Sequence, residues 1–142
     1  MKPRQLIEKD VAAAIDLSRQ LNPHAPPGPD AEAQFLKILA HPGTTVWGTE
    51  CESAVVSMVT LHLMPNLTYG GRPYGLIENV ITHASYRGRG FARASIELAL
   101  RHAEDSGAYK VMLLTGVKND AVGFYEKLGF SAEEKIGMIR RF

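Results

Sequence analysis

The chain has 142 residues and a mass of 15.6 kDa, so we expect residues 1–142 to form one ordinary domain. Its 16 basic and 15 acidic side chains give a net charge of +1, which argues against non-specific binding to nucleic acid or membranes. The lone cysteine, Cys51, excludes an internal disulfide framework and a cysteine-rich zinc site. The opening residues MKPRQLIEKD lack the apolar core of a signal peptide, and no apolar run approaches the ~20 residues that cross a bilayer. A cytoplasmic location is therefore expected.

The chain begins with a short strand, and two helices are predicted to follow it. Apolar residues recur at helical spacing over Val11–Leu21, with Asp10 as the expected N-cap. A second helix is predicted over Ala31–Ala40, capped by Asp30. The proline-rich segment Asn22–Pro29 is expected to be the loop between them, in a position where it could contact a substrate.

Three strands are predicted in the middle of the chain. Thr44–Thr49 and Ala54–Met64 are rich in β-branched and apolar residues, and the polar segment Glu50–Ser53 is expected to join them as a hairpin. After a loop over Pro65–Pro73, the apolar run Tyr74–Thr82 predicts a buried strand that is interrupted by a glutamate and an asparagine.

Helices and strands alternate in the second half. A helix is predicted over Phe91–Ser106, a buried strand over Tyr109–Thr115 and a short helix over Ala121–Leu128, for which Asn119 is the expected N-cap. A last strand is expected over Ile136–Phe142. The order β-αα-ββ-β-α-β-α-β predicts a mixed α/β (α+β) sheet rather than a doubly wound one.

The turn between the strand ending at Thr82 and the next helix is the most informative segment. It reads HASYRGRGFAR, so that two glycines and three arginines lie at a helix N-terminus. Glycines allow positive φ and close approach of a ligand, and the first amides of a helix attract anions. The segment could be a tight turn with solvated arginines, an RNA contact or a pyrophosphate site. It lacks the third glycine of G-x-G-x-x-G and the Gly-Lys-Ser/Thr of a P-loop, and we favour a cofactor pyrophosphate.

The same turn resembles the pattern Q/R-x-x-G-x-G/A of the GCN5-related N-acetyltransferase (GNAT) family, with RGRGFA at residues 87–92. IENVITHASYRGRG (77–90) and KVMLLTGVKNDAVGFYEKLGF (110–130) also resemble the second half of that fold in order and spacing. The resemblance implies a central, mostly antiparallel twisted sheet with a splayed parallel strand pair and about four helices. Locally it is similar to glucosamine-phosphate acetyltransferases, although those enzymes carry an acidic residue at the position of Leu114.

The resemblance also implies how acetyl-CoA would bind. The strand before the turn would pair with the pantetheine arm, and the turn would bind the pyrophosphate. A further contact to pantetheine comes from the segment before the last helix. The implied cofactor-binding residues are Val80, Ile81, Thr82, Arg87, Gly88, Arg89, Gly90, Phe91, Ala92, Arg93 and Asn119.

Two residues are candidates for acid–base chemistry. Glu78 interrupts an apolar strand, and in a partly dry slot its raised pKa would suit a general base, acting directly or through water. The alternative is a carboxylate that pairs with an arginine or faces solvent. Tyr125 lies where many family members place a tyrosine near the CoA sulfur, so it could protonate the thiolate; the alternative is a core tyrosine.

Other candidates are weaker. Cys51 is flanked by two glutamates, which disfavours a reactive thiolate and favours direct transfer in a ternary complex. Tyr69 and Arg72 are possible acceptor contacts or exposed loop residues. The histidines have no metal-ligand spacing and we expect them on the surface or in loops, with His83 near the turn: His24, His41, His62, His83 and His102.

The function predicted from the sequence is an acetyl-CoA-dependent transfer of an acetyl group to a primary amine of a small molecule or peptide, without a metal. A homodimer bridged by the last strand is expected. The alternatives are a non-catalytic acyl-CoA-binding module and an RNA-contacting domain built on the arginine turn.

Overall fold

A computed structural model describes all residues from 1 to 142 and contains one five-stranded sheet. The strands lie in the order of the sequence: β1 (Lys2–Gln5), β2 (Thr44–Cys51), β3 (Ala54–Met64), β4 (Tyr74–Thr82) and β5 (Val111–Leu113). Neighbouring strands are antiparallel except β4 and β5, which are parallel. The helices are α1 (Val11–Leu21), α2 (Ala31–Ala40), α3 (Phe91–Asp105) and α4 (Val122–Glu126), with short 3-10 turns η1 (Glu8–Asp10), η2 (Tyr69–Gly71) and η3 (Ala84–Tyr86). The mixed α/β architecture expected from the sequence is confirmed.

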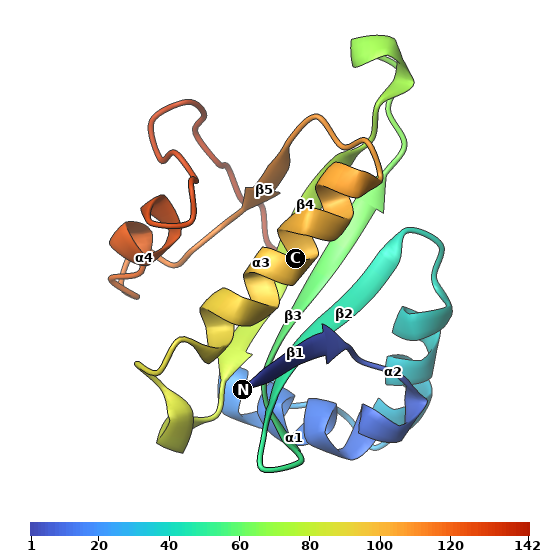
Figure 1. Cartoon of the computed structure of the whole chain (residues 1–142), viewed down its shortest axis with the longest axis vertical. Coiled ribbons are helices and arrows are strands. Elements are labelled where there is room, and N and C mark those ends of the chain that lie inside the picture. The colour runs from blue at the N-terminus through green and yellow to red at the C-terminus, as the bar shows by residue number, and fades with distance from the viewer.

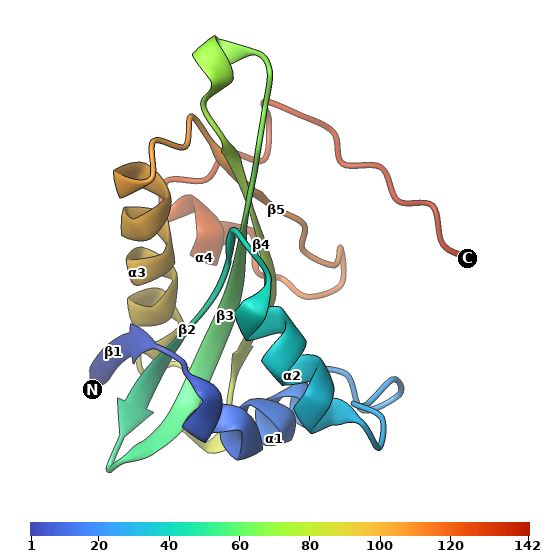
Figure 2. The same ribbon diagram turned by 90° about the vertical axis from the view of Figure 1, so that its right-hand side faces the viewer.

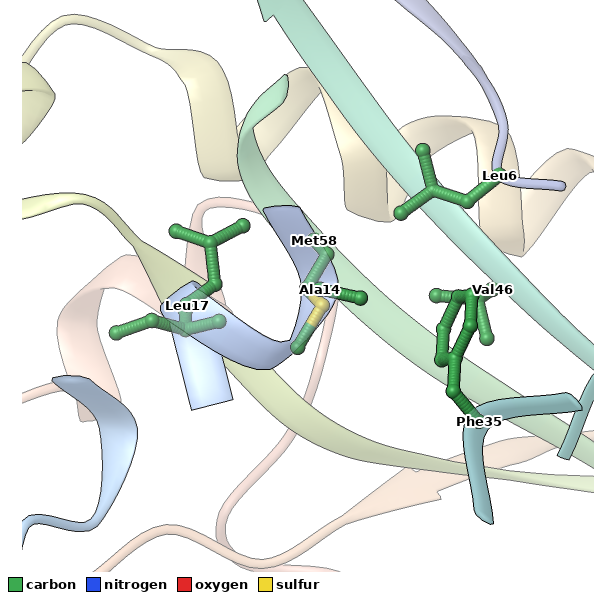
Figure 3. Close-up of a cluster of buried hydrophobic side chains, with 7 residues drawn as sticks. Leu6, Ala14, Leu17, Phe35, Val46 and Met58 are labelled. Atoms are coloured by element: carbon green, nitrogen blue, oxygen red, sulfur yellow. The ribbon is translucent and has the colours of Figure 1, made fainter. Parts of the chain in front are cut away.

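The helices form a layer on each face of the sheet. Figures 1 and 2 show α3 and α4 on one face and α1 and α2 on the other. Because side chains alternate along a strand, the sheet supplies residues to two separate cores. Figure 3 shows the core under α1 and α2, which contains Leu6, Ala14, Leu17, Phe35, Val46, Met58 and Ile81. The core under α3 contains Val59, Leu61, Ile77, Ile96, Ala99 and Ala103.

The hairpin between β2 and β3 is tighter than expected. Glu52 and Ser53 have φ values of 50° and 67°, so they form a two-residue turn with both central residues in the left-handed region. The strand before the turn therefore continues to Cys51, which pairs with Ala54. The prediction that Glu50–Ser53 is all hairpin loop is wrong by two residues.

The expected last strand, Ile136–Phe142, is absent. Residues 131–142 are all exposed and form neither helix nor strand. A strand needs a partner, and the segment pairs with no other strand, although β5 lies at the edge of the sheet. In Figure 2 the segment passes from the side of α3 and α4 to the side of α1 and α2. Gly137 passes so close to Leu114 that an added Cβ would lie 2.5 Å from its Cδ2 atom.

Two of the three predicted N-cap positions are confirmed. Asp10 and Asp30 occupy the N-cap positions of α1 and α2, although neither side chain accepts a capping hydrogen bond from its helix. The prediction for Asn119 is wrong: it is exposed and does not cap α4, whose N-cap position is Ala121 and which begins at Val122. No helix of the structure is long and apolar enough to span a membrane.

Candidate active site

The turn between β4 and α3 presents a row of free backbone donors. Gly88 and Gly90 adopt φ values of 72° and 85°, which a glycine tolerates without strain. The amides from Gly88 to Arg93 donate to no other backbone group, and Ala94 is the first residue of the helix whose amide bonds back, to the Gly90 carbonyl. These free N–H groups point from the positive end of a 15-residue helix, which is a favourable environment for an anion.

The three arginines of the turn are held differently. The Arg89 guanidinium lies 5.3 Å from the ring centres of both Tyr86 and Phe91, which restrains it beside the turn. The Arg87 Nε donates to the Thr82 carbonyl oxygen at 3.2 Å. Arg93 forms a weak ion pair with a glutamate one helical turn further along α3, at 3.5 Å. Three positively charged side chains thus extend from the segment that carries the free amides.

Two buried hydroxyl groups fix the start of α3 against the sheet. The oxygens of Thr49 on β2 and Ser95 on α3 lie 2.8 Å apart, and both side chains are fully buried. They lie 3.1 and 3.3 Å from the Phe91 carbonyl oxygen. Each hydroxyl has one proton, so one donates to the other hydroxyl while the other donates to the carbonyl. The position of the turn is thus set by β2.

β4 is irregular next to this turn. Met58 pairs with Ile81 and Thr60 pairs with Glu78, so Val59 lies opposite two residues of β4. One of the two is Asn79, which has a φ of 54°, and the extra residue forms a β-bulge. Bulges occur next to active sites, where they redirect the backbone.

β4 and β5 separate before β4 ends. Their last pair is Ile77 with Leu113, whereas β4 continues to Thr82. The backbone groups of residues 78–82 that face β5 therefore have no strand partner, and Val80, Ile81 and Thr82 lie in this unpaired stretch. An extended ligand could satisfy these groups as an added strand would.

Glu78 lies at the start of the unpaired stretch and projects toward the α1 and α2 side. It pairs with Thr60, which pairs with Val46, a residue of the core under α1 and α2. Residues paired across antiparallel strands project to the same face. The side chain of Glu78 is exposed, so the partly dry slot that we expected around it is not observed.

Tyr125 lies on the opposite face. It packs against the core under α3, with Phe124 and Phe130 in edge-to-face contact at 5.1 and 6.0 Å between ring centres. Gly129, with a φ of 88°, ends the turn after α4 and lets the Phe130 amide bond back to the Tyr125 carbonyl oxygen. Burial raises the pKa of Tyr125 above its usual value, and no protein group accepts from or donates to its hydroxyl. Its phenol is protonated at neutral pH and free to bind a ligand.

The other predicted site residues take different positions. Leu114 follows β5 and is 53% exposed on the same side of the sheet as Glu78, because it is two residues beyond Met112, the partner of Leu76. Asn119 is exposed after β5, and its side chain lies against Gly116.

The loop expected to contact an acceptor instead packs at the far end of β4. Tyr69 stacks on Tyr109 with ring centres 3.9 Å apart. Arg72 donates to the carbonyl oxygens of Gly107 and Ala108 at 3.0 and 3.1 Å, and so closes the C-terminus of α3. The turn of free amides lies at the opposite end of β4 (Figure 1).

Sequence reasoning also placed His62 in a loop or on the surface, but it lies within β3 and is half-buried. The alternation in Leu61, His62 and Leu63 could have indicated a strand position. The structure contains no group of three histidine, cysteine, aspartate or glutamate side chains placed to hold a metal ion.

Comparison with known proteins identifies this arrangement. Residues 12–130 match the model of the acetyltransferase (GNAT) family. The glucosamine 6-phosphate N-acetyltransferase of Trypanosoma brucei brucei is 35% identical over 135 residues, which cover 93% of this chain and 90% of that protein. The chain belongs to the GNAT family. This GNAT protein is thus an N-acetyltransferase, and the family resemblance found in its sequence is confirmed.

Solved structures agree with the family assignment. A protein of Agrobacterium tumefaciens str. C58 has 38% sequence identity to this GNAT protein and a TM-score of 0.91, with 99% of this chain and 100% of that chain covered. The aminoglycoside N-acetyltransferase AAC(6')-Iy, solved in complex with CoA, has 18% identity and a TM-score of 0.80, with 99% of each chain covered. The second similarity shows a shared fold only.

Proposed function

We propose that this protein transfers the acetyl group of acetyl-CoA to a primary amine of a small molecule in the cytoplasm, by direct attack in a ternary complex. The observation that carries the proposal is the unpaired stretch of β4, which leads directly into the turn of free amides. An anionic, extended ligand matches both parts. In this proposal the turn Arg87–Arg93 holds the CoA pyrophosphate, Val80–Thr82 pair with pantetheine and Asn119 contacts the pantetheine arm.

The opposite placement of the two candidate side chains supports the mechanism. Between β4 and β5 the sheet is open beyond Ile77, so a thioester there is reached from both faces. Glu78, on the α1 and α2 side, takes a proton from the acceptor's ammonium, directly or through water, so that the free amine can attack the thioester carbonyl. A free backbone amide near Val80 or Ile81 stabilises the oxyanion of the tetrahedral intermediate. Tyr125, on the other side, donates its proton to the departing thiolate.

The acceptor is proposed to be a small molecule because the relative of Trypanosoma brucei brucei carries the name of an enzyme that acetylates an amino sugar phosphate. A homodimer is proposed because residues 131–142 project several apolar side chains into solvent, among them Ile136 and Met138 at 92% and 91% exposure. Burying such side chains in a partner would be favourable.

The experiment is a panel of primary amines incubated with acetyl-CoA, with release of free thiol as the readout. Amine-dependent release by the wild-type protein, lost in Glu78→Gln and Tyr125→Phe, is expected. Full activity in both variants would show that the assigned roles are wrong, although the enzyme class would stand.

A further inference from the structure

Three hydrogen-bonded side chains lie where α2, β2 and β3 meet. The Thr44 hydroxyl oxygen is 2.9 Å from Nδ1 of His41 and 2.9 Å from Nδ1 of His62. Thr44 is buried, His62 is half-buried and His41 is exposed where α2 ends. The three side chains therefore connect solvent at His41 to the surface of the sheet at His62.

Counting protons shows what these rings can do. A threonine hydroxyl donates one hydrogen bond, so when Thr44 donates to one Nδ1, the other ring must donate its own Nδ1–H to the hydroxyl oxygen. If Thr44 donates to Nδ1 of His62, the neutral His62 ring carries its proton on Nε2. In that case Nδ1–H of His41 donates to the hydroxyl oxygen of Thr44. In this arrangement His62 presents an N–H group outward without losing its bond to Thr44. No protein group is bonded to Nε2 of His62.

His62 lies on the same face of the sheet as Glu78. Thr60 pairs with Glu78, and His62 is two residues beyond Thr60 on β3, so all three side chains project to one side. Diagonal neighbours of this kind are about 7–8 Å apart, within reach of long side chains or of one small ligand. A molecule whose amine lies over Glu78 can therefore reach His62 with a group several bonds away from the amine.

The residues that lie beside His62 across β4 and β5 are apolar. His62 pairs with Leu76, and Leu76 pairs with Met112. Among the paired residues His62, Leu76 and Met112, the imidazole is thus the polar side chain. This row of residues lies next to the proposed base, Glu78.

We infer that Nε2–H of His62 binds an anionic oxygen of the acceptor, from a phosphate or a carboxylate group, and so determines which amines are acetylated. The inference rests on the proposed function and assigns a specificity residue to that site. The charges are complementary, because the Glu78 carboxylate lies beside the amine while His62 donates to the anionic group several bonds away.

Two substitutions separate this role from a structural one. An asparagine at position 62 places its amide where Nδ1 lies and keeps a bond to Thr44, but it has no atom at the place of Nε2. A glutamine places its amide near the position of Nε2 and gives up the bond to Thr44. His102→Asn is the matched control, because His102 belongs to α3 and packs on Trp47 on the opposite face of the sheet.

The assay compares kcat/KM for paired acceptors with and without an anionic group. Glucosamine 6-phosphate and glucosamine form the phosphate pair, and 4-aminobutyrate and 4-aminobutyramide form the carboxylate pair. We expect His62→Asn to lower kcat/KM about tenfold or more for the anionic member of one pair, through KM, and to change the neutral member less than about twofold. His62→Gln should restore part of the loss. The pair that responds identifies the anionic group.

Three results would overturn the inference. Equal losses on both members of each pair, or full activity of His62→Asn together with damage in His62→Gln, would show that His62 only supports the fold. A wild-type protein that favours neither anionic member would also contradict it, while leaving the acetyltransferase activity intact. The absence of thiol release with every amine would instead overturn the proposed function and this inference with it.

Discussion

The hydroxyl oxygens of Thr49 and Ser95 lie 2.8 Å apart in the interior and join β2 to the first turn of α3. Residues 46 positions apart in sequence thus place the amides of the candidate pyrophosphate turn. Nothing in the sequence predicts a role for either residue, because a serine inside a helix and a threonine inside a strand are common. We therefore expect the affinity for the cofactor to depend on this hydrogen bond between Thr49 and Ser95, although neither side chain belongs to the turn.

Removing one hydroxyl of this pair should weaken both the fold and cofactor binding. Thr49→Val and Ser95→Ala each leave a buried oxygen with one partner fewer, at a cost of about 1–2 kcal/mol in the free energy of unfolding. The double variant should cost less than the sum, because both changes break one network. Urea unfolding measures the first effect and calorimetry with CoA the second. Additive unfolding energies and unchanged CoA affinity would contradict the proposed coupling.

Glu78→Gln should remove the proposed base while leaving the fold unchanged. The side chain is exposed and forms no ion pair, so the free energy of unfolding should change by less than about 0.5 kcal/mol. The kcat should fall about 100-fold, the usual contribution of a general base. Steady-state thiol release measures this, with Glu104→Gln, an exposed acid on α3, as the control. A normal kcat would mean that bulk water accepts the proton.

Tyr125→Phe should lower kcat about 100-fold with little change in CoA affinity, because only the proton donor is lost. Burial raises the pKa of Tyr125 above the usual 10.0, so the phenol stays protonated to higher pH than an exposed tyrosine. The wild-type kcat should therefore show no decline from tyrosine ionisation below about pH 10. A pH–rate profile tests both statements, and Tyr109→Phe, at the other end of the sheet, is the control. A decline near neutral pH that the variant lacks would contradict the assignment.

The parts that sequence could predict are those with local physical causes. The turn at Arg87–Arg93 was predictable because glycines and arginines follow an apolar strand directly. The splay of β4 from β5 could be predicted only from the family resemblance. No local sequence pattern indicates where two strands that are distant in sequence stop pairing. The bulge at Asn79 could not be predicted from the sequence either, because asparagine tolerates a positive φ but does not require it.

Two of the wrong predictions concern segments whose local chemistry fits a role that the fold does not give them. Ile136–Phe142 has the composition of a strand, but it pairs with no strand and leaves the edge of β5 free. Asn119 has the chemistry of an N-cap, yet α4 begins three residues later. His62 was overlooked for a different reason: its partners, Thr44 and His41, come from other elements and are visible only in the folded protein.

The amino-terminal strand should make stability sensitive to acid through Asp10. Arg4 donates to both carboxylate oxygens at 2.7 and 2.8 Å, and the Ile7 amide donates at 2.8 Å. The Arg4 hydrogen bonds are the main reason that the pKa of Asp10 lies below its usual 3.8. Since the folded pKa is lowered, this stabilisation is present above pH 3.8 and is lost as pH falls through the folded value.

Asp10→Asn should therefore be less stable than the wild type at pH 7, by about 1–3 kcal/mol, because Arg4 loses a charged partner. The difference should shrink as pH falls below 3.8. Thermal unfolding between pH 2 and 7 measures it, with Asp16→Asn as the control, because Asp16 is exposed on α1 and has no ion pair. A constant difference across this range would contradict the role of Asp10.

Deleting residues 131–142 tests the proposed homodimer. Ile136, Met138 and Phe142 recur with the period of a strand and are almost fully exposed, and the edge of β5 is unpaired. If two chains pair through these segments, the wild type should sediment at twice the chain mass of 15.6 kDa and the truncated chain at that mass. Arg140→Gln with Arg141→Gln, which keeps the apolar residues, should remain dimeric because apolar burial supplies the association energy. A monomeric wild type, or a truncated chain that still dimerises, would show that this segment does not form the interface.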